Sequence, residues 1–376
     1  MRYAGTGGRT ERSGAGVFDV AVVGAGPAGS TLARKLATGG ARVILLERAR
    51  LPRYKPCGGG LTRRALDQLP DEALPLVRVR PTAAQVVFGD RKVRVPAPSG
   101  SLGMVMRDAF DHRLAELAVA AGATLRQGAP VTGVRSGGGA VELIAGGEAV
   151  AARWVAACDG STGPFSGPLG VQLGLAVPPP RIGALEVEVE DPDGRWGTDL
   201  RGDFDLVPGG YGWVFPKAGV LSVGVACWRP GQGGARLRAQ LDGYLERLGL
   251  SDRPVLSRRG HPIPVGGRLP VRHLISAHAL RVGDAAGLAD PLFGEGIANA
   301  LESADLAASA ILRENPAGYA RAVARRIYAR FAVARGLAAA FYPAPVPWFM
   351  ATRLCPPAGA AFFAFIVGGS ARAPAV

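Results

Sequence analysis

Near the start of the chain, hydrophobic runs typical of strands alternate with segments that have the hydrophobic spacing of helices. Val20–Val23 is a short apolar run, typical of a buried parallel strand, and residues 27–36 follow as a helix. A second apolar run over 41–46 predicts the next strand. From Arg107 the apolar positions fall at helical spacing as far as Gly122. Strand and helix in alternation predict an α/β fold with a parallel sheet.

Two later segments alternate with the period of a half-buried strand. Residues 77–95 do so around a turn at Gly89 and Asp90, as a β-hairpin would. Residues 183–226 combine the stretch ALEVEVE with turn-rich sequence, which predicts an antiparallel sheet. Residues 280–312 return to a strand, a loop and a long helix. This order predicts one domain that is interrupted by pieces of another.

The sequence GAGPAG separates the first predicted strand from the first helix. In a βαβ nucleotide fold, Gly24 permits the tight turn, Gly26 lets the backbone approach a pyrophosphate, and Gly29 allows close helix–strand packing. Glu47 ends the second strand 18 residues beyond Gly29, near the roughly 20 expected for a carboxylate that binds a ribose hydroxyl. A chance turn is the alternative in a chain with 55 glycines among 376 residues, but this context favours nucleotide binding.

Composition restricts the partners. The formal net charge of +14 is typical of nucleic-acid binding, yet only four of the 44 basic residues are lysine, which leaves 40 arginines. In a chain rich in alanine, glycine and proline, this bias indicates coding preference, and no basic block is interleaved with aromatic residues. We therefore predict no nucleic-acid partner. Anionic lipid or a phosphorylated substrate stays compatible with the charge.

Cysteine and histidine spacing predicts neither a metal site nor a disulfide framework. We interpret the histidines as surface or hydrogen-bonded structural residues and expect a reducing, cytoplasmic compartment. The first 16 residues lack the apolar core of a signal peptide, and no apolar run is long enough to span a bilayer cleanly. The residues concerned are Cys57, Cys158, Cys227, Cys355, His112, His261, His273 and His278.

Five motifs follow one another between residues 17 and 315. They are GAGPAGS, PRYKPCGGGL, CDGSTG, YGWVFPK followed by VGVA, and GDAAGLADPLFGEGI. With these motifs in this order, the chain resembles the flavin-dependent geranylgeranyl reductase family, within the fold group of para-hydroxybenzoate hydroxylase. The resemblance implies FAD as cofactor and an isoprenoid or other apolar small molecule as substrate. It also implies that the electron donor is NAD(P)H, which would visit transiently because no second convincing GxGxxG unit exists, or a reduced carrier protein.

We accordingly predict an α/β protein with a Rossmann-like FAD-binding domain, interleaved with an antiparallel-sheet substrate domain and followed by a helical region. The predicted bounds are 1–16 for a flexible leader, 17–75, 101–170 and 276–315 for the FAD-binding domain, 76–100 and 171–275 for the substrate-binding domain, and 316–376 for a helical and apolar C-terminal region.

The resemblance also implies which residues hold FAD. Asp284, at a strand end, would accept a ribityl hydroxyl, and the helix from Ile297 would direct its positive end at the flavin pyrimidine edge. Arg107 would reach the phosphates or the flavin. The implied cofactor residues are Gly24, Gly26, Pro27, Ala28, Gly29, Glu47, Arg48, Cys57, Gly58, Gly59, Gly60, Arg107, Asp159, Gly160, Gly283, Asp284, Pro291, Gly294, Glu295, Gly296 and Ile297.

The motif YGWVFPK provides the predicted substrate site. In a strand, Tyr211, Trp213 and Phe215 point to one face and form an aromatic wall for a long apolar ligand, and Lys217 could meet a phosphate head group. The alternative is an ordinary aromatic core stripe, which the accompanying motifs disfavour. Cys57 has two interpretations of equal weight: a catalytic thiol near the flavin and the substrate double bond, or a small buried filler.

The C-terminal region combines arginines over 313–335 with a strongly apolar stretch over 336–369. One interpretation is a peripheral membrane contact, with arginines toward anionic head groups and aromatic residues at the interface. The other is that helices of this region pack over a substrate tunnel.

The sequence thus predicts an FAD-dependent reductase that hydrogenates carbon–carbon double bonds of a geranylgeranyl-type isoprenoid chain by hydride transfer from reduced flavin. An FAD-dependent aromatic or polyketide monooxygenase would share nearly all the cofactor residues, because a fold does not determine a function. A flavoprotein that only binds and carries lipid is a third, non-enzymatic hypothesis.

Overall fold

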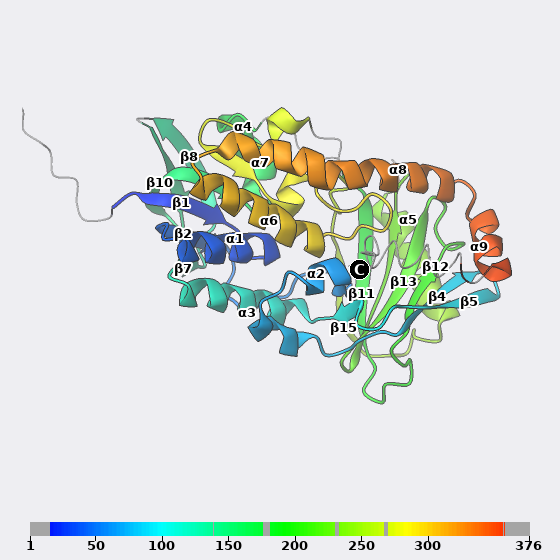
Figure 1. The fold of residues 1–376 in the computed structure, drawn as a ribbon. Helices are drawn as coiled ribbons and strands as arrows, with labels where there is room; N and C mark the ends of the chain where they lie inside the picture. The colour runs from blue at the N-terminus through cyan, green and yellow to red at the C-terminus, as the bar shows by residue number, and fades with distance from the viewer. Residues whose placement is uncertain are drawn as a thin grey trace, which may run out of the picture.

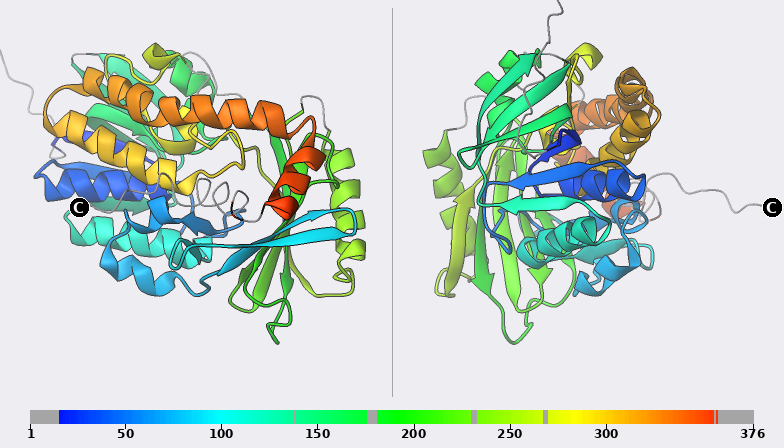
Figure 2. Two further views of the ribbon diagram at one scale, coloured as in Figure 1. Left: turned by 45° about the vertical axis from the view of Figure 1, so that its right-hand side comes forward. Right: turned by 90° about the vertical axis from the view of Figure 1, so that its left-hand side faces the viewer.

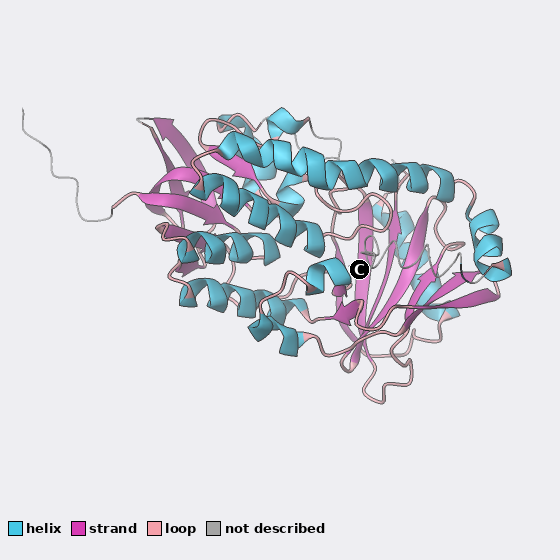
Figure 3. Cartoon of the chain, in the orientation of Figure 1, coloured by secondary structure: helices cyan, strands magenta, loops and turns pink. Residues whose placement is uncertain are grey.

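The computed structural model describes residues 16–137, 139–175, 181–229, 233–266, 270–355 and 357. Two large sheets lie side by side, and most helices gather around the first of them (Figures 1 and 3). The mixed α/β class predicted from the sequence is confirmed. The predicted leader, apart from Gly16, and residues 358–376 of the predicted C-terminal region lie outside the described residues.

The first sheet has the strand order β7-β2-β1-β10-β9-β8, with β16 beside β10. Its central strands pair in parallel, whereas β8, β9 and β10 form an antiparallel meander. Val20, Ala21 and Val22 have no exposed surface, because both faces of β1 are covered. The strands are β1 (Phe18–Val23), β2 (Val43–Glu47), β7 (Thr124–Gln127), β8 (Val131–Gly137), β9 (Ala140–Ala145), β10 (Glu148–Ala157) and β16 (Ala279–Arg281).

Helices cover one face of this sheet and pack against one another. Leu32 and Leu36 of α1 lie fully buried in the same cluster as Ala304 of α6 and Ala115 of α3. Helix α8 continues from this layer toward the second sheet, where α9 closes the end (Figure 2). The helices are α1 (Pro27–Thr38), α2 (Arg63–Leu66), α3 (Arg107–Ala120), α4 (Pro168–Gln172), α5 (Gly234–Arg247), α6 (Ile297–Leu312), α7 (Pro316–Val323), α8 (Ala329–Phe341) and α9 (Pro345–Leu354).

The second sheet has the order β15-β11-β14-β13-β12-β4-β5. The hairpin predicted within 77–95 is β4–β5, and it joins the strands of the 183–260 region in one sheet. The sheet is mixed and not purely antiparallel as predicted, because β12 pairs with β4 in parallel. A short ribbon, β3 (Gly60–Thr62) with β6 (Leu102–Met104), lies between the sheets. The strands of the second sheet are β4 (Ala83–Phe88), β5 (Arg91–Pro96), β11 (Gly183–Glu190), β12 (Leu200–Asp203), β13 (Gly210–Lys217), β14 (Val220–Cys227) and β15 (Val255–Gly260).

The two faces of the second sheet have different coverings. Val187 and Val189 of β11 pack with Leu241 and Tyr244 of α5 in one buried cluster. The alternate residues of β11, which include Glu186, point to the opposite face, where the first sheet lies. Both faces of β11 are therefore buried, although one of them carries carboxylates. The predicted domain bounds remain a prediction, but the sheet assignments agree with the interleaved order on which they depend.

No helix within the described ranges is both long and apolar enough to cross a membrane.

Gly29→Ala should destabilise the protein. The added Cβ would lie 1.9 Å from the carbonyl oxygen of Gly24, so α1 must move away from β1, at a cost on the order of 1–3 kcal/mol. Gly243→Ala in α5 is the matched control, because a Cβ there meets open space and should be neutral or stabilise by about 1 kcal/mol. Denaturant unfolding of both variants measures the difference. An unchanged midpoint for Gly29→Ala would contradict the close α1–β1 contact.

Candidate functional site

A cavity of about 830 Å³ is lined from both sheets and by α8 and α9. It brings together most of the residues predicted from the five motifs. Those that line it are Gly24, Gly26, Pro27, Ala28, Glu47, Arg48, Cys57, Gly58, Gly59, Gly60, Arg107, Asp159, Gly160, Tyr211, Trp213, Phe215, Asp284, Gly294, Glu295, Gly296 and Ile297.

The N-terminus of α1 opens on one end of this cavity. The first helical hydrogen bond runs from Ser30 N–H to the carbonyl of Gly26, so the N–H groups of Ala28 and Gly29 have no acceptor within the helix. A Cβ at Gly26 would approach no atom closer than 3.9 Å, which leaves the backbone accessible to a ligand. Gly24 has φ +101° and lies against the backbone of Cys158. This end is therefore built for an anion close to the main chain.

A chain of buried ion pairs surrounds the same end. Glu47 accepts hydrogen bonds from the N–H groups of Ala25 (2.8 Å) and Ala49 (3.1 Å), and the Nε of Arg53 lies 3.4 Å from its carboxylate. Arg53 also contacts Asp111 at 3.0 Å. The carboxylate of Glu47 thus fixes the glycine turn as well as facing the cavity.

Arg107 belongs to this chain and is almost fully buried. Its Nε and Nη2 each lie 2.8 Å from the carboxylate of Asp111, one helical turn further along α3. Burial opposes its charge, but the paired carboxylate raises the pKa of Arg107 above its ordinary value. Asp111 therefore fixes the position of the Arg107 guanidinium, the group that is predicted to contact FAD.

Two half-buried carboxyl groups, Asp159 and Asp284, face the cavity near strand ends. Asp159 accepts one hydrogen bond, from Phe165 N–H at 2.7 Å, and burial raises its pKa to about 6. Its second oxygen, Oδ1, is buried without a hydrogen-bond partner among the described residues. Burial also raises the pKa of Asp284, and Lys55 and Arg107 oppose that shift. Both carboxyl groups could accept hydrogen bonds from hydroxyls of a bound ligand.

Lys55, His261 and Ser161 form a polar cluster that lines the cavity. The Nζ of Lys55 lies 2.6 Å from Nε2 of His261, and Ser161 Oγ lies 3.0 Å from the same nitrogen. Burial, together with Arg107, lowers the pKa of Lys55 from 10.5 to about 8. Burial and the charge of Lys55 lower the pKa of His261 to about 3, so its imidazole is neutral. The structure agrees with a hydrogen-bonded role for His261 but places it in the cavity, which its spacing did not predict.

Close contacts require two of the three glycines in the loop of PRYKPCGGGL. A Cβ at Gly58 would meet the ring of Phe215 at 2.6 Å, and one at Gly59, which has φ +75°, would meet the carbonyl oxygen of Val105 at 2.3 Å. A Cβ at Gly60 would meet nothing within 4 Å. The loop therefore lies directly against the aromatic wall.

Two buried polar side chains, Glu186 and Lys217, hold the backbone of Cys57. Its N–H donates to Glu186 Oε1 (3.1 Å), and its carbonyl accepts from the Nζ of Lys217 (2.9 Å). Lys217 is also paired with Glu188 at 2.7 Å. Among the described residues, Lys217 is not part of the cavity lining, so its ammonium is engaged elsewhere and not free to meet a ligand head group as predicted.

Tyr211, Trp213 and Phe215 lie along β13 and form the predicted wall. Neighbouring ring centroids are 5.9 Å and 6.2 Å apart. Tyr211 donates a hydrogen bond to the carbonyl of Phe293 (2.9 Å), which fixes the end of the wall. Phe204 and Phe341 add further rings to the same lining.

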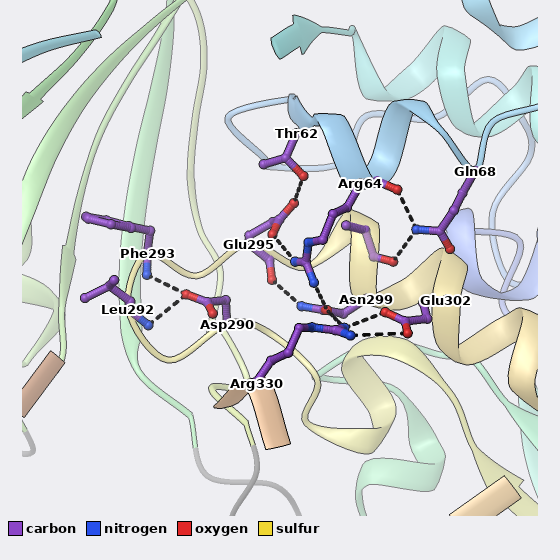
Figure 4. Close-up of polar contacts among 11 residues, drawn as sticks. Thr62, Arg64, Gln68, Asp290, Leu292, Phe293, Glu295, Asn299, Glu302 and Arg330 are labelled. Atoms are coloured by element: carbon purple, nitrogen blue, oxygen red, sulfur yellow. Dashed lines mark hydrogen bonds and ion pairs between the residues drawn. The ribbon is translucent and has the colours of Figure 1, made fainter. Parts of the chain in front are cut away.

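The loop before α6 is fixed by its own acids (Figure 4). Asp290 accepts hydrogen bonds from the N–H groups of Leu292 (2.9 Å) and Phe293 (3.0 Å). The carboxylate of Glu295 bonds to Thr62 and lies 2.5 Å from Nη2 of Arg64. Glu295 thus connects the loop to α2, which is a structural contact as well as a place in the lining.

Three predicted cofactor residues lie outside the described cavity lining, and each makes a structural contact instead. Gly29 lies close to Gly24. Gly283 has φ +62°, and a Cβ added there would lie 2.9 Å from Ala28 Cβ. The carbonyl of Pro291 accepts a hydrogen bond from Trp228 Nε1 at 2.7 Å.

The sequence did not point to several lining residues. Arg53 and Lys55 lie within the motif PRYKPCGGGL, and their positive charge is the sequence signal that could have indicated a place in the site. In ALEVEVE, Ala184 and Glu186 point to the same face of the strand, and both line the cavity. The alternating pattern alone does not show which face of the strand lines a site. Phe341, Trp348 and Phe349 of the C-terminal region also line the cavity, which is the covering arrangement named above as one of two alternatives.

The cavity fits FAD. A diphosphate suits the α1 N-terminus with its neighbouring cations, and ribityl or ribose hydroxyls suit Asp284, Asp159 and Glu47. The FAD binding domain family matches residues 17–199. The fold and the site therefore define an FAD-dependent oxidoreductase.

Known proteins resemble the chain over most of its length. The menaquinone reductase of Mycobacterium tuberculosis (strain ATCC 25618 / H37Rv) is 33% identical, over 85% of this chain and 83% of that protein. The digeranylgeranylglycerophospholipid reductase of Thermoplasma volcanium is 32% identical, over 77% of each chain. The crystal structure of a geranylgeranyl bacteriochlorophyll reductase-like protein from Thermoplasma acidophilum is 27% identical and superposes with a TM-score of 0.70, over 86% of this chain and 88% of that one. The chain belongs to the geranylgeranyl reductase family.

The lowered pKa of Lys55 predicts a pH dependence of stability in the flavin-free protein. Between about pH 8 and 10.5 the unfolded chain binds more protons at this lysine than the native state does, so stability should rise with pH. The expected gain is on the order of 3 kcal/mol. It is measured as the unfolding free energy of wild type minus that of Lys55→Met. Lys35→Met, at an exposed ion pair with Asp305, is the control. If the difference in unfolding free energy between wild type and Lys55→Met does not change between pH 8 and 10.5, the burial of the Lys55 charge is contradicted.

Proposed function

We propose that this protein is an FAD-dependent reductase that hydrogenates carbon–carbon double bonds of an isoprenoid chain. The observation that carries this proposal is the continuity of the cavity. One cavity joins the α1 N-terminus and its cations to the aromatic wall of β13. A cofactor at the first end and a long apolar ligand at the second would therefore share one space.

The division of residues in the cavity supports distinct roles. We assign the anion-binding end, with Gly26, Ala28, Arg107 and Asp284, to FAD. We assign the aromatic end to the substrate. When bound and reduced, FAD would supply a hydride. The chain's own part is to orient the alkene, exclude water and supply a proton.

The aromatic wall suits the demands of an isolated alkene. Such a bond accepts hydride poorly, so protonation of one carbon develops positive charge on the other. The faces of Trp213 and Phe215 would stabilise that charge by cation–π attraction, worth about 0.5–2 kcal/mol. Cys57 stays a candidate for contact with substrate or flavin, because it lines the cavity and its backbone is held on both sides.

Two further observations favour a reductase over a monooxygenase. The relatives reported above are named as reductases, of menaquinone and of a digeranylgeranylglycerophospholipid. The wall is apolar over several rings, which suits a polyprenyl chain better than one small aromatic ring. We propose NAD(P)H or a reduced carrier protein as the source of electrons.

Anaerobic single turnover tests the proposal. The flavin is reduced with dithionite and mixed with geranylgeranyl diphosphate, and flavin reoxidation is followed together with product mass. We expect reoxidation and a product heavier by the mass of H₂ for each bond reduced. A flavin that stays reduced until oxygen is admitted, followed by hydroxylation of an aromatic substrate, would support the monooxygenase. A lipid carrier would show no turnover with any reductant.

Phe215→Leu tests the part assigned to the aromatic wall. Leucine keeps an apolar side chain but removes the π face, so loss of about 1–2 kcal/mol of cation stabilisation should slow the chemical step about 5- to 30-fold. Substrate affinity should change little. Phe18→Leu at the start of β1 is the control, because Phe18 packs in the first sheet. An equal loss in both variants, or a loss in affinity alone, would contradict the charge-stabilising role.

A further inference from the structure

Glu186 and Trp213 are neighbours across one strand of the second sheet. Both stand opposite Gly224 of β14, Glu186 from β11 and Trp213 from β13. A Cβ at Gly224 would lie 2.1 Å from the indole ring, so the missing side chain lets Trp213 lie flat across β14. A carboxyl group therefore stands next to the aromatic wall, and both line the cavity.

Hydrogen bonds connect Glu186 to the residues around the proposed substrate. Its Oε2 accepts from Ser222 Oγ (2.9 Å), which in turn accepts from Trp213 Nε1 (3.1 Å). Its Oε1 accepts from the N–H of Cys57 (3.1 Å). Only 4% of Glu186 is exposed, yet it lines the cavity, so this buried carboxyl group faces the space where we place the alkene.

A second set of hydrogen bonds leads from Glu186 to the surface. Tyr54 OH donates to Glu186 Oε1 at 3.2 Å, and Ser257 Oγ donates to Tyr54 OH at 2.6 Å. Tyr54 is 40% exposed. Partial burial raises the pKa of Tyr54, so its hydroxyl stays neutral and can accept one proton while it donates another. These contacts form a continuous hydrogen-bonded path from solvent to the cavity.

The other candidates for a proton donor are less well placed. Lys55 is bonded to His261, and Asp284 and Arg107 act on its charge, so it belongs to the end assigned to FAD. The sulfur of Cys57 accepts a hydrogen bond from its own loop, at Gly59 N–H (3.4 Å). Glu186 combines contact with the cavity at the aromatic wall with a path to solvent.

We propose that Glu186 donates the proton in alkene reduction and that Tyr54 and Ser257 return one from solvent. This inference rests on the proposed function. The Glu186 O–H bond breaks, and its proton forms a new C–H bond with one alkene carbon as the π bond breaks. The hydride from reduced FAD, which is oxidised by two electrons, forms the C–H bond at the other carbon. The carboxylate left on Glu186 then takes a proton from Tyr54, which takes one through Ser257 from water.

Anaerobic single turnover with Glu186→Gln tests the chemical step. The rate of flavin reoxidation by geranylgeranyl diphosphate should fall about 100-fold or more, while flavin content and substrate affinity stay at wild-type values. Tyr54→Phe should give a smaller loss of rate. Glu190→Gln, at the end of the same strand, is the matched control and should behave as wild type. Wild-type turnover by a folded, flavin-loaded Glu186→Gln enzyme would overturn the proposal.

Infrared difference spectra of the holoprotein, reduced minus oxidised, test the path without any substrate. We expect a protonated carboxyl band that is present in wild type and Glu190→Gln and absent in Glu186→Gln. In D₂O its isotope shift should develop more slowly in Tyr54→Phe. If no protonated carboxyl component is lost in Glu186→Gln, or if exchange in Tyr54→Phe equals that in wild type, the proposal is overturned. If wild type reduces no alkene, the proposed function fails, and the infrared result alone decides on the proton path.

Discussion

The two sheets are joined where buried polar side chains from the second sheet hold the loop of Cys57. Lys217 donates to the carbonyl of Cys57 while paired with Glu188, and Glu186 accepts its N–H. Polar side chains removed from water are costly unless they are hydrogen-bonded, so these side chains and the loop stabilise each other. This mutual dependence places the glycine loop against Phe215 and so defines the boundary between the two ends of the cavity.

The cofactor end and the apolar end follow opposite physical rules. At the first end, helix and cations offer donors to an anion, and each buried acid has a hydrogen bond or a cation beside it. At the second end, rings from β13, the loop before α6 and α8 contact one another. Their polar tips are hydrogen-bonded, Tyr211 to the carbonyl of Phe293 and Trp213 to Ser222 Oγ. One cavity therefore provides both a strong electrostatic field and a region that favours hydrocarbon.

Local sequence patterns predicted the parts of the site that depend on neighbours in the chain. The turn at Gly24 and Gly26, the shared parity of Tyr211 and Trp213, and the hairpin near Gly89 all follow from spacing of a few residues. Contacts between distant residues could not be predicted in this way. Lys55 and His261 are separated by 206 residues, and nothing in either segment shows that they meet. Lys217 illustrates the same limit, because the sequence at the end of YGWVFPK does not show that its ammonium pairs with Glu188.

Strand β14 carries small residues beneath the aromatic wall. Opposite Tyr211, Trp213 and Phe215 it carries Ala226, Gly224 and Ser222, three of the smallest side chains. The rings can lie flat over β14 because no large side chain of that strand projects beneath them. Under the proposed function, the width of the hydrocarbon that fits depends on the residues beneath the wall. No residue of β14 lines the described cavity. Single methyl groups added or removed on this strand would therefore change the width of ligand that fits, without touching the ligand.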